Sequence, residues 1–121
     1  MTIKSYRDLK VWQKAIDLVV QSYRLTKAFP KAETYALSGQ IQRAAISIPA
    51  NIAEGHGREH LGDYLHHLSI ANGSHLELET HLLIANRLSY LQNSDLESIL
   101  ERTTEVGRML AGLMMKLEIS E

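Results

Sequence analysis

The sequence lacks cysteine altogether, and its 121 residues include only two prolines and one tryptophan. Without cysteine the chain forms neither disulfides nor thiolate metal sites, and a reducing compartment is permitted. No apolar stretch approaches the ~18 residues of a transmembrane helix, and residues 1–8 have no apolar signal-peptide core. We therefore expect one cytoplasmic domain over residues 1–121 with no membrane partner.

Positive charge is scarce overall, although it is concentrated in the first half of the chain. The formal net charge is -1, which divides into +5 over residues 1–58 and -6 over residues 59–121. A protein dedicated to nucleic acids normally carries a basic excess, which this chain lacks. The asymmetry still allows one basic face.

Apolar residues recur every three or four positions in four long segments, and nowhere do they alternate as in a β-strand. We predict helices at about residues 6–28, 34–55, 61–91 and 95–118. Because the turns between them are short, the expected fold class is all-α, an antiparallel up-and-down four-helix bundle.

Each predicted helix has one apolar face for the core. In the first helix this face is Leu9, Trp12, Ile16, Val19, Tyr23 and Thr26. In the second it is Leu37, Ile41, Ala44, Ala45, Ile48 and Ile52. In the third it is Leu61, Tyr64, Leu68, Ala71, His75, Leu78, Leu82 and Ala85. In the fourth it is Leu96, Ile99, Thr103, Val106, Leu110, Leu113 and Leu117.

Local signals mark the helix ends. Ser5 with Asp8, and Ser94 with Glu97, have the spacing of capping boxes. Pro30 ends the first helix, because the residue before a proline avoids the α region.

The second helix combines an internal proline with two terminal glycines. We expect Pro49 to kink this helix rather than break it, because the apolar period continues in phase on both sides. Gly55 and Gly57 fit a helix end, where glycine adopts positive φ without steric cost.

Several motifs together resemble one protein family. They are Tyr6-Arg7-Asp8-Leu9, Val11-Trp12-Gln13-Lys14-Ala15, Phe29-Pro30, most of residues 42–58, Ile70-Ala71, Gly73-Ser74 and Glu77-Leu78-Glu79. They resemble the bacterial four-helix-bundle proteins encoded in intervening sequences of large-subunit ribosomal RNA genes. The resemblance covers residues 6–117 and implies a ring-like homopentamer. Relatives that are accessory proteins of diversity-generating retroelements are also pentameric, and they bind a reverse transcriptase and nucleic acid. For most members the biochemical role is unknown.

Catalytic and metal-binding patterns are missing. None of the six histidines occurs in the Glu-x-x-His pattern of a di-iron bundle. Asp63 and His66 have the same spacing with aspartate in place of glutamate, which is a single, weak match. His56 and His60 lie on the two sides of the glycine turn, and His75 belongs to a core face, where a neighbour would satisfy it. No nucleophile motif or phosphate loop is present. We therefore expect that the protein has no enzymatic activity and binds neither a metal nor a cofactor.

The side of residues 42–58 opposite the core favours self-association, because it carries small residues around an arginine and a glutamate. Gly73, opposite the core face of the third helix, indicates a close backbone approach. The candidate interface and polar-network residues are Arg43, Ser47, Ala50, Asn51, Glu54, Arg58, Gly73, Glu77 and Glu79. Arg43 is expected to pair with Glu77 or Glu79, either within one subunit or across the interface.

We predict a non-enzymatic, self-assembling interaction module, a homo-oligomer that the resemblance makes a pentamer. Its other partner is a protein, RNA or DNA. The alternative is a nucleic-acid-binding accessory protein whose basic first helix is repeated around a ring, which would raise avidity. Its phosphate contacts would be Arg7, Lys10, Lys14, Arg24 and Lys27.

Overall fold

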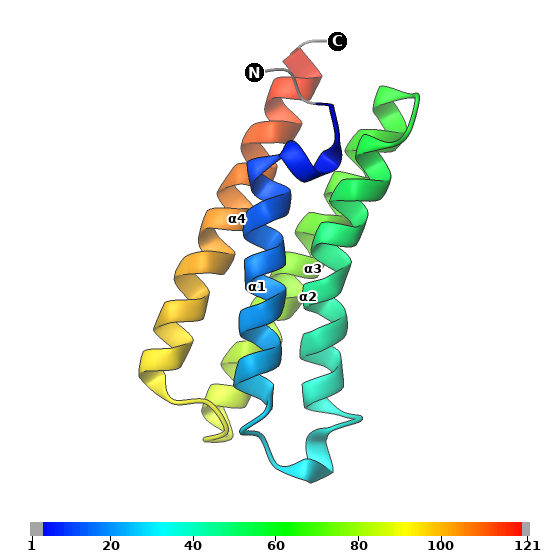
Figure 1. Ribbon diagram of the computed structural model, residues 1–121. Helices are drawn as coiled ribbons and strands as arrows, with labels where there is room; N and C mark the ends of the chain where they lie inside the picture. Colours follow the sequence, from blue (N-terminus) through cyan, green and yellow to red (C-terminus); the bar gives the residue numbers. More distant parts are fainter. Residues whose placement is uncertain (1–3, 120–121) are drawn as a thin grey trace.

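The computed structural model describes residues 4–119, and this range contains helices and no strand. The four long helices are α1 (Lys10–Thr26), α2 (Leu37–His56), α3 (Leu61–Arg87) and α4 (Asn93–Ile119). Two short 3-10 helices, η1 (Tyr6–Asp8) and η2 (Lys31–Glu33), precede α1 and α2. Successive long helices run in opposite directions (Figure 1). The all-α four-helix bundle expected from the sequence is confirmed.

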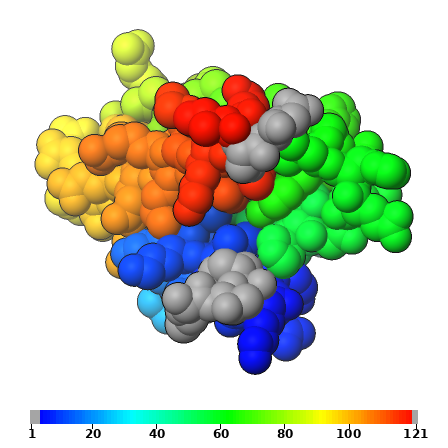
Figure 2. Space-filling model, turned by 90° about the horizontal axis from the view of Figure 1, so that it is seen from above, coloured from blue at the N-terminus to red at the C-terminus, as the bar shows by residue number. Residues whose placement is uncertain are grey.

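The bundle closes on itself in chain order. Each helix packs against the next, and α1 packs against α4. Seen along the bundle, the blue N-terminal segment, the green α2–α3 region and the orange-to-red α4 occupy separate sectors (Figure 2). None of the helices within residues 4–119 has the length and apolarity needed to cross a bilayer.

The core faces of α2, α3 and α4 agree with the apolar period. Leu78 and Leu82 in α3 and Val106 and Leu110 in α4 have no exposed surface, and in α2 the same holds for Ile48. Only the ends of the predicted faces are half-exposed, and these are Leu37, Leu61, Tyr64, Leu96, Leu113 and Leu117.

The predicted core face of α1 was wrong by about one position. The buried residues are Val11, Ala15, Leu18, Ser22 and Thr26, whereas Tyr23 is 39% exposed. Small residues fit where α1 lies against its neighbours, and the larger side chains beside them remain at the edge. Ser22 tolerates burial because its hydroxyl donates to the carbonyl of Leu18 at 2.8 Å.

Helix ends also differ from the expected positions. The capping box of Ser5 and Asp8 is present, but it caps η1, and α1 begins later, at Lys10. Ser94 lies inside the first turn of α4, which begins at Asn93, so it is not the N-cap. The helix α2 begins at Leu37 rather than 34, and α3 ends at Arg87 rather than 91.

Of the two glycines expected at the end of α2, Gly57 is the C-cap residue, as predicted, but with φ of -80°, and no described glycine has positive φ. Gly55 is buried inside the helix, where an added Cβ would lie 2.8 Å from the Cβ of His67. Its role is therefore to let α3 approach α2 closely. At Pro49 the helix is continuous, so a complete break is excluded.

Candidate interaction surface

Ser47 and Asn51, two of the candidate residues on α2, lie in a polar network with α3 of the same chain. Ser74 donates its hydroxyl to Ser47 Oγ at 2.7 Å, and Asn51 Nδ2 donates to Ser47 Oγ at 3.0 Å. His67 Nδ1 lies 3.0 Å from Asn51 Oδ1. Because an amide oxygen only accepts, this contact requires the proton on Nδ1. Ser47 and Asn51 therefore fix the register of α2 against α3.

Arg43 lies one turn before Ser47, and Glu77 lies about one turn after Ser74 on the antiparallel helix. Both are exposed, yet Arg43 forms no ion pair within residues 4–119. The guanidinium lies over Gly39, where an added Cβ would be 3.2 Å from Nη1. Glu77 instead approaches His81 at 3.9 Å. Pairing of Arg43 with Glu77 or Glu79 within one chain is thus not formed, and pairing across an interface remains a prediction.

The other candidate on α2 with a charge, Glu54, pairs with Arg58 at 3.1 Å. Both side chains are about half exposed, so the pair contributes little to stability.

A group of exposed residues on α2 and α3 forms what we call the α2–α3 face. Its members are Arg43, Ala50, Glu54, Ile70, Gly73 and Glu77, all of which are exposed. No atom of residues 4–119 lies within 4 Å of an added Cβ at Gly73, so the expected close approach at this residue does not occur within that range. The surface there is open to a neighbouring molecule.

The outer side of α3 is unusually apolar for a solvent-facing helix. Leu76 is 53% exposed, Leu83 48% and Ile84 43%, and Leu88 directly after the helix is 51% exposed. Leu83, Ile84 and Leu88 border an open hollow of 430 Å³ near the end of the helix. Exposed apolar residues that share a hollow, as Leu83, Ile84 and Leu88 do, are typical of an interaction site.

Glu79 has a role inside the subunit that the sequence did not reveal. Thr103 donates to Glu79 Oε2 at 2.6 Å, and His75 Nε2 lies 3.0 Å from the same oxygen. The His75–Glu79 contact has the distance of an ion pair, but the atoms are not aligned for a hydrogen bond. His75 is 6% exposed, and an added Cβ at Gly107 would lie 2.5 Å from its Cε1. Glycine at 107 therefore makes room for a buried histidine. The expected core position of His75 is confirmed, but neither of its ring nitrogens has a hydrogen-bond partner within residues 4–119, so the expected satisfaction by a neighbour is not met.

The five basic candidates Arg7, Lys10, Lys14, Arg24 and Lys27 are all exposed, but acidic groups are interspersed with them. Lys14 pairs with Glu105 of α4 at 3.5 Å. Asp17 shares a shallow depression with Arg24 and Arg102. The basic residues of α1 therefore do not form an uninterrupted positive surface.

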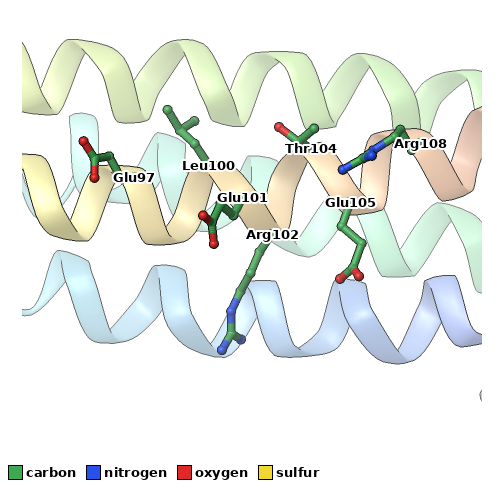
Figure 3. A pocket seen from close by; sticks show the side chains of 7 residues that line it. All are labelled: Glu97, Leu100, Glu101, Arg102, Thr104, Glu105 and Arg108. Atoms are coloured by element: carbon green, nitrogen blue, oxygen red, sulfur yellow. The ribbon is translucent and has the colours of Figure 1, made fainter.

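A concavity of 780 Å³ lies over the outer side of α4, and all of its lining residues come from this helix. Arg102 and Glu105 point toward α1, whereas Leu100 and Thr104 point toward α3 (Figure 3). It is an open charged surface and not an enclosed pocket. No three His, Cys, Asp or Glu side chains gather as metal ligands in the part of the chain that the structure describes.

These features define a class of protein, a small four-helix bundle with exposed apolar residues on α3 and no cluster of metal ligands among residues 4–119. The profile of the 23S rRNA-intervening sequence protein family matches residues 7–112, and the chain belongs to this family. Its fold is similar to the crystal structure of a protein of unknown function from the S23 ribosomal protein family of Bacteroides thetaiotaomicron. The two share 28% identity with a TM-score of 0.81, over 87% of this chain and 95% of that one. No curated protein gives a significant match.

Proposed function

We propose that this protein is a non-enzymatic, cytoplasmic assembly module that associates with copies of itself through the α2–α3 face together with the exposed apolar residues Leu76, Leu83 and Ile84 of α3. The observation that carries the proposal is the exposed apolar surface of α3, which a solitary bundle would leave in water. Burial of apolar area contributes roughly 25 cal/mol per Å², so Leu76, Leu83 and Ile84 favour association over exposure.

The shape and charge of the α2–α3 face support the same proposal. The open surface at Gly73 and the small side chain of Ala50 allow a neighbouring helix to approach closely. Arg43 has no ionic partner within residues 4–119, and Glu77 has only a distant one. A second copy supplies a partner for Arg43 without rearrangement of the core, in a charge-assisted hydrogen bond.

The resemblance to ring-forming bundles makes the proposed oligomer a pentamer. In a ring every subunit uses two different surfaces, because a head-to-tail contact closes by rotation. The α2–α3 face is then one of the two surfaces. An additional protein, RNA or DNA partner would bind to the assembled ring.

The mass in solution tests this proposal. One chain has a mass of 13.6 kDa, so a pentamer gives five times that value by light scattering. We expect Ile70→Glu to lower the mass, because it places a charge in the buried part of the contact. Arg43→Ala should weaken assembly more mildly.

The matched control is Met115→Glu, which places the same charge at a side chain that is 62% exposed on α4. It should leave the mass unchanged. A mass of one chain for the unmodified protein would refute self-association, and a normal oligomer for Ile70→Glu would show that a different face is used.

A further inference from the structure

A second, separate feature lies where α1 leads into α2, at the lower end of the bundle in Figure 1. A cavity of 320 Å³ opens there, and its lining includes Tyr23, Lys27, Phe29, Lys31 and Ser38. This volume is at the lower end of the range for small-molecule sites. None of the residues that line it belongs to the α2–α3 face.

Ser38 is a buried polar side chain without a partner. The residue is 5% exposed and lines the cavity, and its hydroxyl makes no hydrogen bond within residues 4–119. Its oxygen is not among the fully buried side-chain atoms that lack a partner, so the hydroxyl is open to the cavity. A ligand oxygen in the cavity provides an acceptor.

The backbone at the same point also offers donors. The N–H of Leu37 is bonded to Glu33, and that of Gln40 to Ala36, but those of Ser38 and Gly39 have no partner in the described chain. Of these two residues, Ser38 lines the cavity and Gly39 follows it in the helix. They belong to the first turn of α2, where the helix dipole adds positive potential. This arrangement favours an anion.

Two lysines supply full positive charge. Lys27 and Lys31 both line the cavity, and neither forms an ion pair within residues 4–119. The lining contains no carboxylate. The nearest acid in sequence, Glu33, accepts from Leu37 N–H at 3.3 Å and from the Tyr90 hydroxyl at 3.0 Å, so it is already engaged.

We propose that this cavity binds a small phosphate monoester. Its phosphate lies against the ammonium groups of Lys27 and Lys31 and accepts from the Ser38 hydroxyl and the free N–H groups of the first turn. A monoester carries close to two negative charges at neutral pH, which matches the two lysines. The remainder of the ligand packs against Tyr23 and Phe29.

The test is a titration of the ¹⁵N-labelled full chain with ribose 5-phosphate, inorganic phosphate and a dinucleotide that carries only a phosphodiester. We expect the amide signals of Ser38 and Gly39 to shift, and ribose 5-phosphate to bind most tightly. No shift of these signals at about 10 mM ribose 5-phosphate, where even millimolar binding saturates, would overturn the proposal. Equal affinity for inorganic phosphate or for the dinucleotide would overturn the assignment to a monoester.

Variants separate this site from general charge attraction. The double variant Lys27→Gln, Lys31→Gln should raise the dissociation constant about tenfold or more, because two charge-assisted contacts are lost. Ser38→Ala should raise it less. The control Lys10→Gln, Lys14→Gln removes the same charge outside the cavity and should change it less than about twofold. An equal effect of the control would refute a specific site. Because the readout is binding at this cavity, its failure leaves the self-association proposal unaffected.

Discussion

At the scale of single residues, Gly107 shows how one missing side chain makes room for a buried polar group. An added Cβ would lie 2.5 Å from Cε1 and 2.9 Å from Nε2 of His75, which has little free space around its ring. We expect Gly107→Ala to destabilise the fold by about 1–3 kcal/mol, as overpacking of a core does. Urea unfolding followed by circular dichroism measures the change.

The same helix provides the matched control for this prediction. Gly112 also lies inside α4, but an added Cβ there meets no atom within 4 Å. Gly112→Ala should therefore stabilise the protein by up to about 1 kcal/mol, through helix propensity alone. If both substitutions stabilise to the same degree, the packing of His75 on Gly107 is not restrictive.

At the scale of the elements, one hydrogen bond joins the two connections at the lower end of the bundle. The Tyr90 hydroxyl, after α3, donates to Glu33 Oε2 in η2 at 3.0 Å. This hydrogen bond, together with burial and the negative charge of Glu33, raises the pKa of Tyr90 above its usual value near 10. A raised tyrosine pKa means that the native state favours the neutral hydroxyl.

The link between these connections therefore predicts a loss of stability in alkali. The contribution of Tyr90 is fully present below the pKa of an unfolded tyrosine, and it is lost as the pH rises toward the higher native value. We expect Tyr90→Phe to make stability less dependent on pH above about 10. Denaturant unfolding at several alkaline pH values measures this. An unchanged pH dependence would show that ionisation of Tyr90 is not coupled to folding.

The buried residues of a helix can be predicted from sequence when only one set of apolar residues has the helical spacing. In α3 the three-four spacing from Leu68 to Ala85 identified the buried residues correctly. In α1 two overlapping sets of residues have this spacing, and the set that contains small residues such as Ala15 forms the core. Size and apolarity alone favour the set that contains the larger side chains. Packing against specific neighbours decides which set is buried, and the sequence does not show those neighbours.

The candidate interface was predictable only in part, because it depends on the register between helices. The sequence placed Ser47 opposite the core face and gave Asn51 as a candidate for the interface or polar network, but in the structure the two contact Ser74 and His67 of α3. Gly55 allows this close approach, and no local signal in the sequence reveals which residues it would meet.

At the scale of the whole molecule, the arrangement of charge determines which large partners approach. The acidic residues Glu97, Glu101 and Glu105 recur every four positions on α4, and Glu105 points toward α1, where it pairs with Lys14 (Figure 3). Within about a Debye length of 8 Å at physiological salt, these carboxylates reduce the positive potential of α1. We therefore expect weak retention of the unmodified protein on a nucleic-acid column.

Neutralising these acids should reveal the basic face. The triple variant Glu97→Gln, Glu101→Gln, Glu105→Gln changes the formal net charge from -1 to +2 and removes the partner of Lys14. We expect it to elute at higher salt, because each phosphate contact adds to the salt dependence of binding. The control Glu59→Gln, Asp63→Asn, Glu118→Gln makes the same change in net charge at other exposed positions. Equal retention of the two variants would mean that net charge alone governs binding. Steeply salt-dependent binding of the unmodified chain would instead mean that the α4 carboxylates do not screen α1.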